Sequence, residues 1–336
     1  MNGKRIAIAL ATPLVIGLTA VGGARAWLNT QTVTGKNTSD VMLRVEKGDS
    51  FEKVLKQLQD RQVIASVDGM KLYARYGGTA PKVKEGTYRF RPGLNRDQVF
   101  RALEQPIIQR VRIPEGWWVS RVAKLLESKG ICSAQEYIEL TQQPAQFADV
   151  VNFALPKRSL EGFLFPDTYD FPPMMGARAV IERQLRTFEQ RTEGKLDQSS
   201  DLARVVNIAA MVELEAKLDR ERPVIAGVIE NRLRKPMRLQ IDATVLYALG
   251  EWKVLPPGVV NTIQHPYNTY VNDGLPPGPI GSPGLASILA AANPQKTNAL
   301  YYMAMPDGSH LFTSSYSQHL VNIRVARAAA RRVTER

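Results

Sequence analysis

A short unit that recurs three times constrains most strongly what this chain of 336 residues can fold into. In each copy a β-like stretch ends in a glycine, an apolar pair follows six and seven residues later, and a leucine follows ten residues later. The glycines are Gly48, Gly93 and Gly116, and the leucines are Leu58, Leu103 and Leu126. This spacing predicts a strand, a tight turn with the permissive backbone of glycine, and an amphipathic helix. It is equally compatible with three unrelated turns of the same kind.

Two of the expected helices carry a start signal. Two pairs have the spacing of a capping box: Asp49 with Glu52, and Asn95 with Gln98. In a capping box, the side chain of each residue accepts a hydrogen bond from the backbone N–H of the other. We therefore expect helices to begin directly after Asp49 and Asn95.

The N-terminus carries an uncharged, mostly apolar run that ends at Ala24, behind Lys4 and Arg5. At ~1.5 Å per residue the run reaches the ~30 Å of a bilayer core. We expect an N-terminal transmembrane anchor at 1–26 and a polar linker at 27–40, with the rest of the chain on the outer face. A cleaved signal peptide stays open, because Ala24-Arg25-Ala26 fits signal-peptidase cleavage.

Composition narrows the function classes. Lys and Arg number 44 against 32 Asp and Glu, a net charge of +12 that favours anionic partners such as lipid headgroups or acidic polymers. An exported domain meets no DNA, so we expect no nucleic-acid partner, and the terminal arginines 324–336 are interpreted as a solvated helix face. The single cysteine excludes an internal disulfide. The three histidines form no H-E-x-x-H pattern, so we expect neither a metal nor a cofactor.

The segment 201–233 predicts two helices broken near Pro223, and its chemistry centres on Glu215. On a helical projection Glu215 lies in the middle of an apolar arc formed by Ile208, Met211, Val212 and Leu218. Desolvation there would raise its pKa and leave a proton available for general acid catalysis. Glu213 points to the other side of the helix. The alternative is a structural glutamate neutralised by Arg222 or Arg232.

Two further regions have open interpretations. The apolar run 159–169 contains Glu161 and Asp167, and Glu161 is either a group that supports a site from behind or a paired structural acid. Residues 255–284 hold seven of the 21 prolines and predict a stiff loop that presents aromatic and amide side chains. Such a loop suits a sugar-binding cleft, but it could also be a rigid connector.

Taken in order, these motifs resemble the endolytic murein transglycosylases, the YceG-like family. The match is dense from 159 to 320 and is carried by Glu161-Gly162, Pro166-Asp167-Thr168, Glu213-Leu-Glu215, Glu221-Arg222, Glu230-Asn-Arg-Leu233, Met237 to Thr244, Pro266 to Tyr270, Gly274 to Gly278 and Ser282-Pro-Gly284. In addition, Val45 to Phe51 followed by Val54 resembles the start of a LysM module, a small fold that holds N-acetylglucosamine-containing glycans.

The resemblance implies an α+β protein with an N-terminal transmembrane helix, a LysM-like α/β subdomain at 41–110 and a mixed α+β catalytic domain at 111–336. It implies a single-pass protein of the cell inner membrane with its catalytic domain in the periplasm. The implied partners are peptidoglycan glycan strands, the membrane through the N-terminal helix, and the peptidoglycan synthases.

The resemblance also implies a lyase that needs no cofactor or metal. Such enzymes cut the β-1,4 bond between N-acetylmuramic acid and N-acetylglucosamine in nascent strands, which leaves 1,6-anhydro ends and ends strand elongation. The catalytic acid of the family falls on Glu215, and we expect Gln240, Asp242, Asn268 and Tyr270 to bind the glycan. The family often has Thr or Ser where Ile241 stands, so we expect no side-chain role there. The alternatives are a hydrolase with a second carboxylate, from Glu161, Glu221 or Asp242, and a non-catalytic wall-binding protein.

Overall fold

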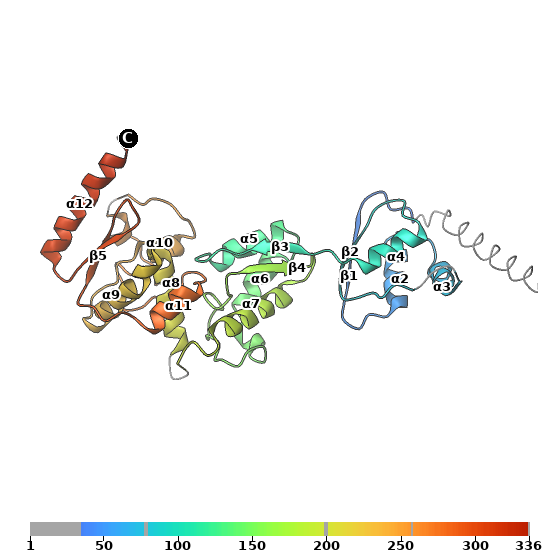
Figure 1. Cartoon of the computed structure of the whole chain (residues 1–336), viewed down its shortest axis with the longest axis horizontal. Helices are drawn as coiled ribbons and strands as arrows, with labels where there is room; N and C mark the ends of the chain where they lie inside the picture. Colours follow the sequence, from blue (N-terminus) through green and yellow to red (C-terminus); the bar gives the residue numbers. More distant parts are fainter. Residues whose placement is uncertain (1–34, 77–79, 198–200, 257, 335–336) are drawn as a thin grey trace, which may run out of the picture. The chain divides into compact units, whose positions relative to one another are not determined.

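The computed structural model describes residues 35–76, 80–197, 201–256 and 258–334. The chain divides into two compact units, one comprising residues up to Gln109 together with Asp170–Met175, the other comprising Arg110–Tyr169 and Gly176 onwards. Helices and two-stranded sheets occur together in the described residues, so the expected α+β class is confirmed (Figure 1).

Along the chain, the first unit has a strand, two helices, a second strand that pairs antiparallel with the first, and a third helix. Its elements are β1 (Val41–Val45), α2 (Phe51–Asp60), α3 (Val67–Tyr76), β2 (Gly86–Phe90) and α4 (Arg96–Glu104). In the sheet, Val41 lies opposite Phe90 and Val45 lies opposite Gly86. One apolar core joins strands and helices, and its fully buried members include Leu43, Leu55, Tyr88 and Leu103.

The recurring unit of the sequence is confirmed as strand, turn and helix in all three places. Gly48, Gly93 and Gly116 have φ values of +89°, +75° and +74°, which a side chain would disfavour. The third copy consists of β3 (Gln109–Arg112) and α5 (Val119–Ser128). In each helix the apolar pair and the leucine are buried: Val54, Leu55 and Leu58; Val99, Phe100 and Leu103; Val122, Ala123 and Leu126.

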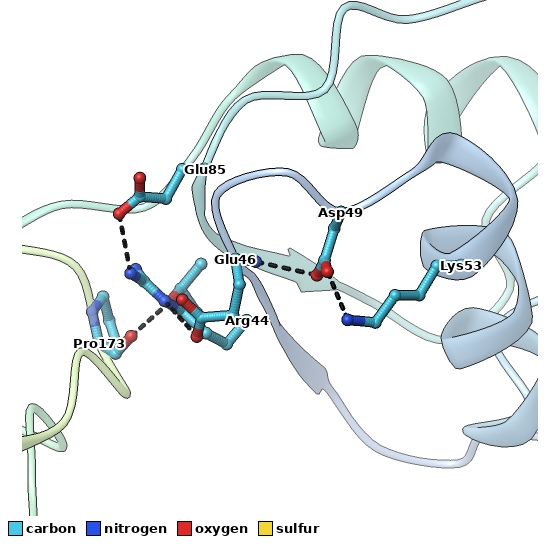
Figure 2. Close-up of polar contacts among 7 residues, drawn as sticks. Arg44, Glu46, Asp49, Lys53, Glu85 and Pro173 are labelled. Atoms are coloured by element: carbon cyan, nitrogen blue, oxygen red, sulfur yellow. Dashed lines mark hydrogen bonds and ion pairs between the residues drawn. The ribbon is translucent and has the colours of Figure 1, made fainter.

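One of the two expected capping boxes is present. Asn95 accepts from the Gln98 backbone, and the Gln98 side chain accepts from the Asn95 backbone. The other prediction was wrong by one residue, because Ser50 is the cap of α2 and accepts from the Lys53 backbone at 3.1 Å. The Asp49 carboxylate is used elsewhere: it accepts from the Glu46 backbone at 3.0 Å and pairs with the Lys53 ammonium (Figure 2).

Within the first unit, a hydrogen bond fastens the segment 170–175 to β2. The hydroxyl of Thr87, in β2, donates to the carbonyl of Pro173. Nearby, the Arg44 guanidinium pairs with Glu46 at 3.2 Å and with Glu85 at 3.3 Å (Figure 2).

Apart from Gln109 at the start of β3 and Asp170 and Phe171 at the end of β4, which belong to the first unit, the second unit contains the remaining elements. They are β3, α5, α6 (Ala134–Thr141), β4 (Thr168–Phe171), α7 (Ala177–Thr192), α8 (Leu202–Glu215), α9 (Arg222–Arg234), α10 (Asp242–Leu249), α11 (Leu285–Ala292), β5 (Tyr301–Ala304), β6 (His310–Thr313) and α12 (Tyr316–Thr334), with 3-10 turns at Pro144–Phe147, Asp219–Glu221 and Val259–Asn261. Strand β3 pairs with β4, and β5 pairs antiparallel with β6. Helices α8, α9 and α11 pack against one another, and α10 packs on α8.

The expected break between two helices is present, but its position changes the setting of Glu215. Ala216 leaves the helix with φ −72° and ψ 125°, and Pro223 lies in the first turn of α9, where a missing N–H costs nothing. Glu215 is therefore the last residue of α8 rather than the middle of an apolar arc. Leu218, which we expected on the same arc, lies beyond the helix, so that part of the prediction was wrong.

The predicted anchor at 1–26 lies outside the described residues, as does most of the linker at 27–40. Within the residues that the structure describes, none of the helices has both the length and the apolar character needed to cross a bilayer. The LysM-like character of the subdomain at 41–110 stays a prediction.

Candidate active site

Glu215 faces a cavity of about 630 Å³ in the second unit. The walls come from the end of α8, from α10 and from the irregular segment that follows α10. The lining residues include Leu214, Glu215, Ala243, Leu246 and Trp252. The cavity thus combines the carboxyl groups of Glu215 and Asp242 with apolar and aromatic walls, which is the usual make-up of a small-molecule or polymer cleft.

Burial raises the pKa of Glu215 to about 7. The negative charge of Asp242 raises that pKa as well, whereas a hydrogen bond from Tyr302 and the charges of Arg232 and Lys217 lower it. At neutral pH the carboxyl group therefore exists in both protonation states. This balance is what a group needs to give a proton and take one back in a single turnover.

Tyr302 reaches Glu215 from β5, where it lies opposite Phe312 of β6. Its ring packs edge-on against His310 with 5.5 Å between the ring centres. His310 is held in turn by Glu221, whose carboxylate lies 2.7 Å from Nδ1 and also accepts from the His310 backbone at 3.2 Å. The hydroxyl that contacts Glu215 is thereby fixed from behind by a buried pair.

Two of the predicted glycan-binding residues line the same cavity as Glu215. Asp242 is the first residue of α10, and Tyr270 comes from the proline-rich loop. The Tyr270 hydroxyl donates to Asp242 at 2.5 Å. Burial raises the pKa of Tyr270 above its ordinary value, so this hydroxyl keeps its proton.

The other two lie outside the cavity lining. Asn268 is fully buried; its amide donates to the carbonyls of Val260 and Ile263 at 2.7 and 2.8 Å and accepts from the Tyr270 backbone at 2.9 Å. It holds the loop that presents Tyr270. Gln240 has an exposed side chain and a positive φ of 52°, and its backbone N–H donates to the carbonyl of Thr269 at 3.1 Å.

Ile241 is 1% exposed and belongs to the apolar core. The proline-rich loop is irregular apart from the turn at Val259–Asn261, as expected, within its described residues 255, 256 and 258–284.

The contacts of Glu213 bear on whether Arg222 or Arg232 neutralises Glu215. Arg222 pairs with Glu213 at 3.1 Å and with Asp219 at 3.0 Å, and Glu213 also accepts from the Gly284 backbone at 3.0 Å. Arg232 directs its guanidinium to the carbonyls of Leu300 and Leu239. The structural partner of Arg222 is therefore Glu213, and Glu215 is left to face the cavity.

Glu161 is 4% exposed, and its carboxylate accepts hydrogen bonds from Val119 and from Tyr247. Both of its oxygens lie 3.1 Å from the backbone N–H of Val119, the first residue of α5, and the Tyr247 hydroxyl donates to Oε2 at 3.2 Å. Burial raises the pKa of Glu161 to about 7, and these hydrogen bonds lower it. Asp167, the other acid of this run, pairs with Arg191.

Two residues at the site escaped the sequence analysis. Tyr302 lies 87 positions after Glu215, and the β5–β6 hairpin brings the two together. No local pattern in the sequence of this hairpin indicates that it packs against an acid. Trp252 follows α10 and is 57% exposed at the cavity wall. The one signal for it in the sequence is its place just before the proline-rich segment 255–284. The described residues bring together no group of three His, Cys, Asp or Glu side chains suited to a metal ion.

A carboxyl group whose pKa burial raises to about 7, in a cleft with aromatic walls, is typical of an acid–base enzyme that takes a sizeable polar substrate. The model of the YceG-like family matches residues 43–325, so the chain belongs to that family. It is 30% identical over 298 residues to an endolytic murein transglycosylase of Bacillus subtilis (strain 168), covering 83% of this chain and 82% of the relative.

Further comparisons agree. The chain is 25% identical over 318 residues to an endolytic murein transglycosylase of Streptococcus pneumoniae serotype 2 (strain D39 / NCTC 7466), which covers 84% of this chain but only 58% of that longer protein. The crystal structure of a YceG-like protein from Listeria monocytogenes matches with a TM-score of 0.55 and 29% identity, covering 84% of this chain and 99% of the other.

Proposed function

We propose that this chain cuts the β-1,4 bond between N-acetylmuramic acid and N-acetylglucosamine within peptidoglycan strands and leaves 1,6-anhydro ends. The chain is a lytic transglycosylase, a lyase that acts on peptidoglycan, by its family and by the relatives that bear that name. The observation that supports this specific chemistry concerns the carboxyl group of Glu215. This group lines the cavity, and burial raises its pKa to about 7.

In the first step Glu215 acts as the acid. Its carboxyl proton moves to the glycosidic oxygen as the bond from that oxygen to C1 of the muramic acid breaks, and positive charge develops on the sugar ring. The leaving N-acetylglucosamine departs with a free hydroxyl, and Glu215 becomes a carboxylate. The Tyr302 hydroxyl supports this carboxylate by donating a hydrogen bond.

In the second step the same group acts as the base. The C6 hydroxyl of the muramic acid attacks C1, and its proton passes to Glu215, which closes the 1,6-anhydro ring and restores the starting acid. No water is consumed, so one carboxyl group suffices. Holding C6 and C1 in attack geometry is the main demand on the cleft, and positioning of that kind supplies several kcal/mol in enzymes.

Asp242 and Tyr270 are the groups we assign to hold the glycan at this point, because both line the cavity beside Glu215. Their mutual hydrogen bond fixes the pair and leaves oxygen lone pairs for sugar hydroxyls. Asn268 contributes indirectly, by holding the backbone of Tyr270. We assign exposed Gln240 to contacts with a more distant part of the strand.

A hydrolase is the second candidate, and one observation favours it: Asp242 shares the cavity with Glu215 and could activate a water. The other two acids considered for that role are engaged elsewhere, Glu161 with Val119 and Tyr247, and Glu221 with His310. The products decide between the two. Digests of peptidoglycan should show ends one water lighter by mass than hydrolytic products, and reducing ends would replace the lyase with a hydrolase.

We further propose that the protein acts at the outer face of the inner membrane, held by the run that ends at Ala24, and terminates strands beside the peptidoglycan synthases. The native protein should then stay in the membrane fraction after a high-salt wash and keep its N-terminal residues. A soluble mature protein that begins at Trp27 would contradict the anchor.

For the LysM-like region we propose glycan binding. The isolated segment 41–105 should co-sediment with purified peptidoglycan, and the catalytic part alone should bind more weakly. Equal sedimentation of the two pieces would reduce this region to a spacer.

A further inference from the structure

Three aromatic rings form a cluster that reaches the wall of the Glu215 cavity. Trp118 packs edge-on against Tyr247 with ring centres 5.8 Å apart, and it lies 6.2 Å from Trp252. Trp252 is the outermost ring: it is 57% exposed and lines the same cavity as Glu215. An indole that is supported from behind and open in front offers a flat apolar surface beside the catalytic carboxyl.

The supporting rings are fixed by one buried acid, Glu161. Its carboxylate binds the backbone N–H of Val119, which follows Trp118 and begins α5, and so replaces a side-chain cap that Trp118 cannot supply. The same carboxylate receives the hydroxyl of Tyr247. Glu161 therefore joins the two segments that carry the supporting rings, one from the start of α5 and one from α10.

We propose that Trp252, supported by Trp118 and Tyr247 and locked by Glu161, is a glycan subsite that stacks on the pyranose ring of a sugar next to the cleaved bond. This proposal rests on the proposed function, because it takes the ligand of the Glu215 cavity to be a glycan strand.

The chemistry of the ligand follows from the shape of the surface. A pyranose ring with equatorial substituents has an apolar face of axial C–H groups, which can cover an indole and displace water from it. Tyr270 and Asp242, which line the same cavity, would present polar oxygens to the hydroxyl and amide groups at the edge of the sugar. A β-1,4-linked strand of N-acetylated hexosamines offers both kinds of surface at every ring.

The test measures binding rather than cleavage. The full-length protein carrying Glu215→Gln is the parent, so that the ligand survives, and the probe is a β-1,4-linked tetrasaccharide of N-acetylglucosamine studied by calorimetric titration. Adding Trp252→Ala should weaken binding roughly 5- to 30-fold, the loss expected when one sugar face no longer covers an indole. Adding Trp252→Phe keeps a ring and should recover part of the affinity.

Trp117→Ala is the matched control. Trp117 is the neighbour of Trp118 in sequence, but its ring lies under the Arg121 guanidinium at 4.0 Å and outside the cavity lining. Its removal should leave the affinity within about twofold, a limit set by the absence of any sugar contact to lose. Thermal unfolding of each variant checks that the fold is kept.

Unchanged affinity in Trp252→Ala, or an equal loss in Trp117→Ala, would overturn the subsite. Failure of the proposed function looks different: reducing ends in digests by the unmutated protein would change the reaction but leave the binding comparison intact.

Discussion

The surroundings of Glu215 and of Glu161 differ in one respect that decides what each acid does. Both side chains are withdrawn from water, and this burial raises the pKa of each to about 7. The carboxylate oxygens of Glu161 accept hydrogen bonds from Val119 and Tyr247 within the protein. Glu215 faces a cavity of about 630 Å³ and has Tyr302 as a hydrogen-bond donor.

This contrast shows that a raised pKa is not by itself evidence of a catalytic acid. Structural carboxyl groups that are buried for packing reasons are shifted by the same desolvation. What distinguishes Glu215 is access. A substrate oxygen can reach its carboxyl group through the cavity, whereas the carboxylate of Glu161 is hydrogen-bonded to other groups of the protein. The same Glu→Gln substitution should therefore abolish cleavage at Glu215, whereas at Glu161 it should change stability and leave kcat little changed.

The largest expected effect is the loss of cleavage in Glu215→Gln. The amide keeps the size of the side chain but has no acid proton to give, so both proton transfers fail, and each is typically worth about 10²–10⁴ in rate. Release of 1,6-anhydro ends, followed by mass spectrometry, should fall close to background. The fold should be kept or stabilised, because a desolvated acid is gone. Retention of most activity would refute the assignment.

Glu213→Gln should produce the next largest effect, on stability rather than on chemistry. It removes one charge of a buried pair whose side chains are only 7% and 10% exposed, and it leaves Arg222 with Asp219 as its charged partner. We expect the free energy of unfolding to fall by about 1–3 kcal/mol in denaturant titrations. The rate per folded molecule should stay far above that of Glu215→Gln, and a comparable collapse of the rate would show that the two glutamates act together.

Glu161→Gln should separate stability from proton transfer. The folded-state pKa of about 7 is raised above the value of 4.5 for a free carboxyl, so the folded protein of the unmutated chain loses stability as the pH rises from about 4.5 through about 7. The variant lacks this loss but gives up an acceptor, which costs about 1 kcal/mol at pH 5.

Unfolding curves for Glu161→Gln between pH 5 and pH 8 should therefore be flatter with pH than those of the unmutated protein. Because Glu161 positions the rings behind Trp252, KM should rise while kcat changes little. A large loss of kcat with unchanged KM would instead place Glu161 in proton transfer.

Tyr302→Phe should have the smallest effect and the most specific one. The hydrogen bond from Tyr302 lowers the pKa of Glu215, so its removal should raise that pKa further, by about half to one unit for a bond worth about 1 kcal/mol. Cleavage by the unmutated enzyme should decline as the pH rises through about 7, since the acid form is then lost. In the variant this decline should move to higher pH, and a pH–rate profile with an unmoved alkaline limb would contradict the role of Tyr302.

Local sequence patterns determined the elements that depend on neighbouring residues. The spacing of Gly48, Gly93 and Gly116 predicted three strand–turn–helix units, because a positive φ and an apolar helix face leave their mark within about ten residues. The same grounds predict the capping box at Asn95. They also predict Asp49 as the cap in place of Ser50, because two adjacent residues compete for that role. The importance of Glu215 came from its apolar neighbours and from the order of the family motifs.

Only the tertiary structure decided which groups meet at the site. Tyr302 reaches Glu215 across 87 residues, Trp252 joins Trp118 across 134, and Glu161 connects α5 to α10, and none of these contacts has a period or spacing that a sequence could display. The helical projection already separates Glu213 from Glu215, but only the structure shows that α8 ends at Glu215 and that Arg222 folds back to pair with Glu213. Helix and turn signals are local because backbone sterics are local, whereas a cleft is made by side chains that become neighbours only when the core is packed.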